Sequence, residues 1–76
     1  SLSLKMFLNE EVSRLKTKMN EALEAKEIKN DEEMVEKTRK VFDKLESFKS
    51  SEINENLILT ILRTQKLEQE IFENGD

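Results

Sequence analysis

The side chains of this sequence that could take part in chemistry are carboxylates, hydroxyls and amines, because cysteine and histidine are both absent. Their absence excludes disulfides, thiolate or imidazole metal ligands and a histidine base. Carboxylates lie close together at Glu10–Glu11, Asp31–Glu33 and Glu68–Glu70. Paired catalytic carboxylates need an apolar pocket that separates their pKa values. We place these pairs on solvent-facing positions of helices, so we interpret them as solvated surface.

The hydroxyl groups also lack a partner that would make them nucleophiles. Such a nucleophile needs an adjacent general base, and no nucleophile-elbow motif surrounds any of them. The single glycine, Gly75, leaves no glycine-rich loop to hold a phosphate. The sequence therefore predicts a protein that is not an enzyme and uses no cofactor. We interpret the hydroxyls as helix caps and surface groups: Ser13, Thr17, Thr38, Ser47, Ser50, Ser51, Thr60 and Thr64.

Charge and hydropathy narrow the class of partner. The formal net charge is −4, with 13 basic residues mixed among 17 acidic ones. This mixture lacks the basic patch that is typical of nucleic-acid-binding proteins. The longest apolar run, residues 57–62, is far shorter than the ~20 residues that span a bilayer. We therefore expect a protein partner, with neither strong nucleic-acid binding nor a membrane span.

The elements that must position these residues are expected to be helices, since proline is absent and Glu, Lys and Leu dominate. A first helix is predicted over residues 3–28, with Ser3 as its N-cap. Its apolar stripe toward the core recurs at spacings of three or four: Leu4, Leu8, Val12, Leu15, Met19, Ala22 and Leu23. A second helix is predicted over residues 31–49, where Asn30 followed by Glu33 indicates a capping box.

The last third of the chain combines a serine cap with an almost continuous apolar stretch. A serine at 50–51 is expected to cap a helix over residues 52–63, and a break at 64–65 would begin a fourth helix over residues 65–74. Between residues 53 and 62 apolar side chains run nearly all round the helix, which is typical of a bundle interior or an interface. The sequence predicts an all-α element of three to four helices that either oligomerises or belongs to a larger domain.

The first helix also carries a residue pattern that resembles a known family. It is similar to the first helix of the conserved core of the IWS/Spn family of transcription elongation factors. That helix reads Leu-(Asp/Asn)-Glu-x-(Ile/Val)-x-Arg-Leu-Lys-x-x-Met-Asn-x-Ala. Its Met-Asn-x-Ala part is the most specific, because an arbitrary amphipathic helix has no reason to place an asparagine there. The matching residues are Leu8, Asn9, Glu10, Val12, Arg14, Leu15, Lys16, Met19, Asn20 and Ala22.

A second, looser similarity to the family lies in Leu62, Leu67, Ile71 and Phe72, followed by Asn74 and Gly75. The family usually carries a Leu-Pro step before this block, and the chain has no proline there, so the local turn is expected to differ. The resemblance implies that residues 1–76 form the N-terminal half of a larger right-handed helical bundle related to the TFIIS N-terminal domain. Its C-terminal half would then be a second partner.

The resemblance also implies a nuclear adaptor that binds the histone-chaperone elongation factor Spt-six during RNA polymerase II transcription. Such an adaptor would recognise a short peptide-like segment in a helical groove, with no chemistry of its own. We expect the partner-binding residues in the second half of the chain, at Ile58, Leu62, Arg63 and Lys66.

Two other hypotheses remain open. The near-heptad stripe from Leu4 to Leu23 would also suit a self-contained, oligomeric, coiled-coil-like module of another assembly, although it is shorter than the three to four heptads typical of a coiled coil. A membrane-surface amphipathic helix would need a basic polar face, which Glu10, Glu11 and Glu21 oppose.

Overall fold

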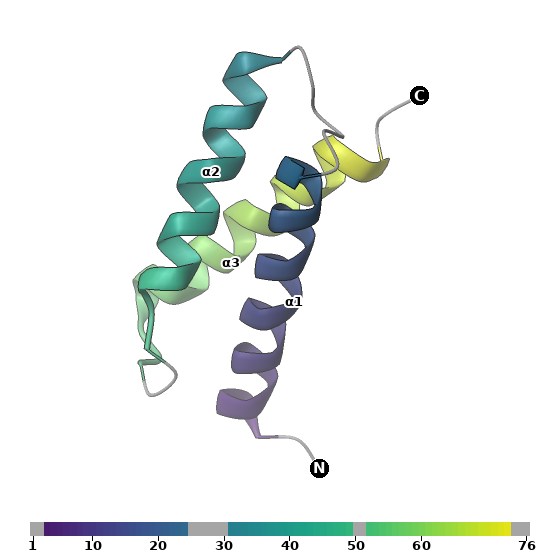
Figure 1. Ribbon diagram of the computed structural model, residues 1–76. Coiled ribbons are helices and arrows are strands. Elements are labelled where there is room, and N and C mark those ends of the chain that lie inside the picture. Colours follow the sequence, from purple (N-terminus) through teal and green to yellow (C-terminus); the bar gives the residue numbers. More distant parts are fainter. Residues whose placement is uncertain (1–2, 25–30, 50–51, 74–76) are drawn as a thin grey trace.

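The computed structural model describes residues 3–24, 31–49 and 52–73, and nearly all of them are helical (Figure 1). Helix α1 spans Leu4–Glu24, α2 spans Glu32–Ser47 and α3 spans Glu55–Glu68. A π-helical segment, η1, continues α3 over Gln69–Glu73. The described residues include no strand. The prediction of an all-α chain is therefore confirmed.

The three helices form a small bundle in which every pair is in contact. Helices α1 and α2 lie side by side and run in opposite directions, and α3 crosses both of them (Figure 1). Two apolar clusters fill the interior at successive levels. The first contains Leu8, Leu15, Leu45, Leu57 and Ile61. The second contains Met19, Ala22, Leu67 and Ile71.

The start of α1 lies at the predicted residue. The Ser3 hydroxyl accepts a hydrogen bond from the Met6 backbone N–H at 3.2 Å, and the Ser3 carbonyl accepts the first helical bond from Phe7 at 2.9 Å. Ser3 is therefore the N-cap of α1, as predicted. The predicted end at residue 28 falls outside the described residues, which stop at Glu24 in this part of the chain.

The caps of α2 and α3 differ from the prediction. Asp31 caps α2, because its carboxylate accepts from the Met34 N–H at 3.0 Å. Asn54 caps α3, because its side-chain oxygen accepts from the Leu57 N–H at 2.9 Å. The expected caps at Asn30 and at serines 50–51 lie outside the described residues, and the helices that they were to cap begin at Glu32 and Glu55 instead.

The predicted division of the last helix at residues 64–65 is wrong, because α3 runs unbroken to Glu68. Thr64 lies fully buried in its middle. Its hydroxyl donates to the Thr60 carbonyl, four residues earlier, at 2.7 Å. The side chain thus satisfies its own polar group inside the bundle and presents its methyl group to the core. Thr38 does the same in α2, donating to the Met34 carbonyl at 2.8 Å.

Candidate functional site

The four predicted partner-binding residues all lie exposed on α3, and they differ in character. Ile58 is 41% exposed and Leu62 is 55% exposed. Arg63 and Lys66 line a surface groove that α3 forms with α2. The structure therefore divides the predicted set into an apolar pair and a basic pair.

A polar contact fixes how α1 and α3 lie against each other. The Arg14 guanidinium donates twice to Glu11 on its own helix, at 2.9 and 2.7 Å. It also donates twice to Glu68 on α3, at 2.7 and 2.9 Å. Gln65 of α3 donates to the same Glu11 carboxylate at 2.9 Å. We call these four residues the Arg14 clamp. One planar cation thereby holds two carboxylates with the bidentate geometry that suits arginine best.

The Arg14 clamp corrects the expectation that Glu11 and Glu68 form a solvated surface. Their side chains are only 14% and 16% exposed, whereas Arg14 is 44% exposed. Hydrogen bonds from Arg14 lower the pKa of Glu11 below its ordinary 4.5, with a smaller contribution from Gln65, although burial acts in the opposite direction. The hydrogen bonds to Glu11 and Glu68 raise the pKa of Arg14. The clamp is therefore an ionised contact between helices.

Exposed apolar residues lie on both α1 and α3, before the clamp residues in each helix. Phe7 lies one turn before Glu11, and Leu62 lies three residues before Gln65. Leu4 and Ile58 lie about one turn further along their helices. All four are exposed by 41–64%. We call Leu4, Phe7, Ile58 and Leu62 the apolar face. Large apolar side chains that stay exposed are candidates for an interaction surface when they form a patch.

The surface groove between α2 and α3 has a different character. Its volume is about 350 Å³. Lys37 and Lys40 line it from α2, and Arg63 and Lys66 line it from α3. The side chains that complete the lining are Val41, Leu67 and Glu70. We call this feature the basic groove.

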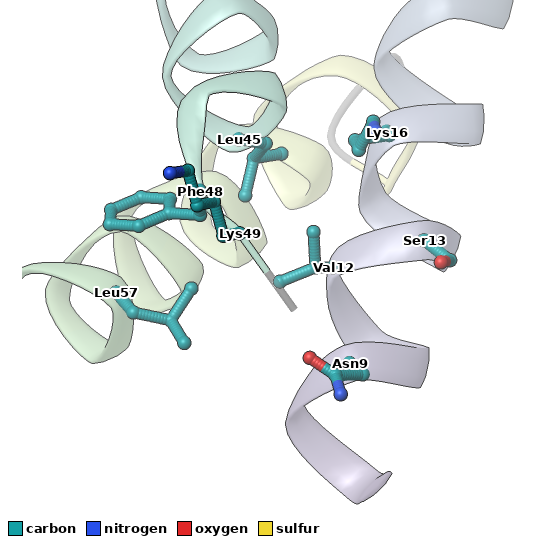
Figure 2. Close-up of a pocket in the computed structure, with 8 residues that line it drawn as sticks. All are labelled: Asn9, Val12, Ser13, Lys16, Leu45, Phe48, Lys49 and Leu57. Carbon is teal, nitrogen blue, oxygen red and sulfur yellow. The ribbon is translucent and has the colours of Figure 1, made fainter. Parts of the chain in front are cut away.

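A smaller hollow of about 160 Å³ opens between α1 and the end of α2 (Figure 2). Val12 and Leu57 point into it from opposite sides, with Leu45 and Phe48 beside them (Figure 2). Polar groups lie at its edge: Asn9, Ser13, Lys16 and Lys49. Its volume is below the roughly 300 Å³ at which small-molecule sites begin, so it could admit one side chain at most.

The residues that the structure describes include carboxylates and hydroxyls that could take part in chemistry. The carboxylates and the other possible ligands in that part of the chain form no group that could hold a metal ion. The buried hydroxyls of Thr38 and Thr64 donate to carbonyls of their own helices. Across the described ranges, no helix is long and apolar enough to cross a membrane.

The residues that resemble the IWS/Spn helix have distinct places in the bundle. Leu15, Met19 and Ala22 are wholly buried, and Arg14 belongs to the clamp. Asn20 is exposed, so packing against the described residues does not explain an asparagine at that position. No family model, curated protein or solved structure matches the chain. The described residues define a small all-α bundle.

Proposed function

We propose that this chain is a non-enzymatic protein-interaction scaffold of RNA polymerase II transcription elongation. It acts in the nucleus and binds a histone-chaperone elongation factor of the Spt-six type. The observation that carries the proposal is the outer face of α3, where Ile58 and Leu62 stand exposed on a helix whose other side is buried. The resemblance of residues 8–22 to the IWS/Spn family is the reason for proposing this particular partner.

Within this proposal α1, the helix that resembles the IWS/Spn family, supports α3 rather than binding the partner itself. The buried side chains of Leu15 and Met19 pack α1 into the core, and Arg14 donates hydrogen bonds to Glu68 of α3. These contacts hold α3 in a fixed orientation, with Ile58 and Leu62 directed away from the core. A preorganised surface binds more tightly, because less conformational entropy is lost on association.

The apolar face also supports the second proposed partner, the remaining helices of a TFIIS-type domain. Leu4, Phe7, Ile58 and Leu62 would pack against such helices in the way that ridges of side chains pack between neighbouring helices. Burying an exposed leucine or phenylalanine contributes about 1.5–3 kcal/mol. A domain completed in this way would be more stable than the bundle of α1 to α3 alone.

Binding to an Spt-six-type factor, measured by isothermal titration calorimetry, tests the proposal. We expect Ile58→Glu together with Leu62→Glu to weaken binding by about a hundredfold, because charges would replace apolar contacts. Met6→Glu is the matched control, since Met6 is a similarly exposed apolar residue that lies outside the apolar face. Equal binding by the native protein and the double variant would contradict the proposal.

The exposed apolar face also favours a second candidate function, a self-contained oligomeric module. A second copy of the chain would then cover Leu4, Phe7, Ile58 and Leu62 in place of other helices. Analytical ultracentrifugation separates the two functions. A discrete symmetric oligomer that Leu62→Glu dissociates would support the module, and a monomer that binds the Spt-six-type factor would support the scaffold.

A further inference from the structure

The basic groove is locally positive, although the net charge of the whole chain is negative. The whole chain carries a net charge of −4, yet four cations line this single groove. Two come from each wall, and the two on each helix are three residues apart: Lys37 and Lys40 on α2, Arg63 and Lys66 on α3. Side chains three residues apart lie on the same side of a helix. Both pairs therefore direct charge toward the space between the helices.

Most of this positive charge is not neutralised within the described part of the chain. Lys37 lies 3.5 Å from Glu33, but both side chains are largely exposed, so this ion pair is weak. Lys40, Arg63 and Lys66 make no ion pair with the described residues. Glu70 is the one carboxylate in the lining. The groove thus presents an excess of cations to a ligand.

The lining between the cations is apolar. Leu67 is buried and Val41 is half-buried, and both line the groove. A bare phosphate or a nucleic-acid backbone would leave this apolar lining without a partner. The groove is shallow, so a single apolar side chain between flanking charges suits it. Its volume of about 350 Å³ is enough for one or two side chains.

We propose that the basic groove binds a short acidic protein segment that inserts an aromatic or aliphatic side chain against Val41 and Leu67. Carboxylates on either side of that side chain meet the cations of α2 and α3. Burial of the apolar anchor provides affinity, and the charge pairs set the register and speed association.

This site overlaps the predicted partner-binding residues at Arg63 and Lys66, but not at Ile58 and Leu62, which carry the function proposed above. It uses Lys37 and Lys40 of α2, which the apolar face does not include, and it leaves Ile58 and Leu62 free. An acidic segment could therefore bind here while other helices or an elongation factor cover the apolar face. Loss of one activity would leave the other measurable.

Fluorescence anisotropy of the intact protein with a short labelled peptide tests the inference. The peptide holds one phenylalanine between runs of glutamate. Two comparison peptides replace either the glutamates with glutamine or the phenylalanine with serine. We expect each replacement to weaken binding by about tenfold or more, because the groove needs both charge and an apolar anchor. A labelled single-stranded DNA is expected to bind more weakly than the parent peptide.

A pair of protein variants with equal net charge locates the binding. Lys40→Glu with Arg63→Glu reverses one cation on each wall of the groove and should reduce affinity for the peptide by about a hundredfold. Lys5→Glu with Arg39→Glu makes the same changes at exposed positions outside the groove and should leave affinity within about twofold. Circular dichroism checks that both variants remain helical. Equal loss in the two variants, equal binding of the serine peptide, or tighter binding of the DNA would each overturn the inference.

Discussion

Arg14 shows how one side chain can determine the relation between two helices. Its guanidinium makes two hydrogen bonds to Glu11 and two to Glu68, so two edges of this planar group face carboxylates of α1 and α3. A lysine at this position could offer a charge but not the same fork of donors. The same geometry explains the titration of Glu11, whose charged form receives N–H donors from both Arg14 and Gln65.

At this residue scale, the stability of the bundle should depend on pH through Glu11. Its pKa is lowered in the folded chain, so the stabilisation is present above its unfolded value of about 4.5 and is lost as the pH falls through the folded pKa. We expect Glu11→Gln to lower the free energy of unfolding at pH 7 and to differ less from the native chain at pH 3. Urea unfolding at several pH values measures this.

The neighbouring carboxylate provides the control for this experiment. Glu10 is exposed and makes no hydrogen bond or ion pair with the described residues, so Glu10→Gln should unfold with the same pH dependence as the native chain. A Glu11→Gln variant whose unfolding free energy falls with acid as steeply as that of the native chain would show that the clamp is not the acid-sensitive contact.

At the scale of elements, the caps determine where helices begin. Asn54 satisfies the Leu57 N–H, and Leu57 is 2% exposed, so the cap and the core contact are set together. We expect Asn54→Ala to lower the free energy of unfolding by about 1 kcal/mol, because a backbone donor would lose its partner. Asn54→Asp should retain most of the stability, since a carboxylate also accepts this bond. Thermal unfolding followed by circular dichroism measures both.

Asn56→Ala is the matched control for the cap. Asn56 is exposed in the first turn of α3, and alanine is the better helix former, so this change should leave stability unchanged or slightly raise it. An equal loss in the two alanine variants would mean that Asn54 acts by something other than capping.

Much of the element layout could be predicted from the sequence, because local patterns determine it. Spacings of three and four identified Leu15, Met19 and Ala22 as core residues of the first helix, and all three are wholly buried. Ser3 was predicted as a cap and is one. These predictions succeed because helix periodicity and capping depend on residues within a turn or two of each other.

The wrong predictions concern helix caps, where several neighbouring residues could serve, and contacts between residues far apart in the sequence. Several polar residues precede α3 in the sequence, and the residue that caps the helix is Asn54, whose side chain accepts from the N–H of the core residue Leu57. The predicted break at residues 64–65 is absent, because the buried Thr64 hydroxyl donates to the Thr60 carbonyl of its own helix. Glu68 lies 54 residues from Arg14, so no local pattern could indicate their contact.

At the scale of the whole molecule, the bundle buries two apolar clusters and leaves a third apolar surface open. Every pair of helices is in contact, so the inner side of α3 packs against both α1 and α2. Yet the apolar stretch predicted to run all round α3 still exposes Ile58, Leu59 and Leu62. Two neighbouring helices cover only part of such a helix, which is the physical basis for expecting a further packing partner.

Two leucines of α3 make this expectation measurable. Leu57 is 2% exposed and Leu62 is 55% exposed, although they lie five residues apart on the same helix. In the chain of residues 1–76, we expect Leu57→Ala to lower the free energy of unfolding by about 2–4 kcal/mol, because it leaves a cavity. Leu62→Ala should change it by less than about 0.5 kcal/mol, since an exposed side chain loses little burial.

The same two substitutions should behave differently once the apolar face is covered. If the proposed Spt-six-type factor covers Leu62, then in its saturating presence Leu62→Ala should cost about 1–3 kcal/mol, because Leu62 would be buried in the complex. Leu57→Ala should cost as much as before and serves as the control. Urea unfolding with and without the factor supplies the four values. If Leu62→Ala costs the same small amount when the factor is present, the factor does not cover Leu62.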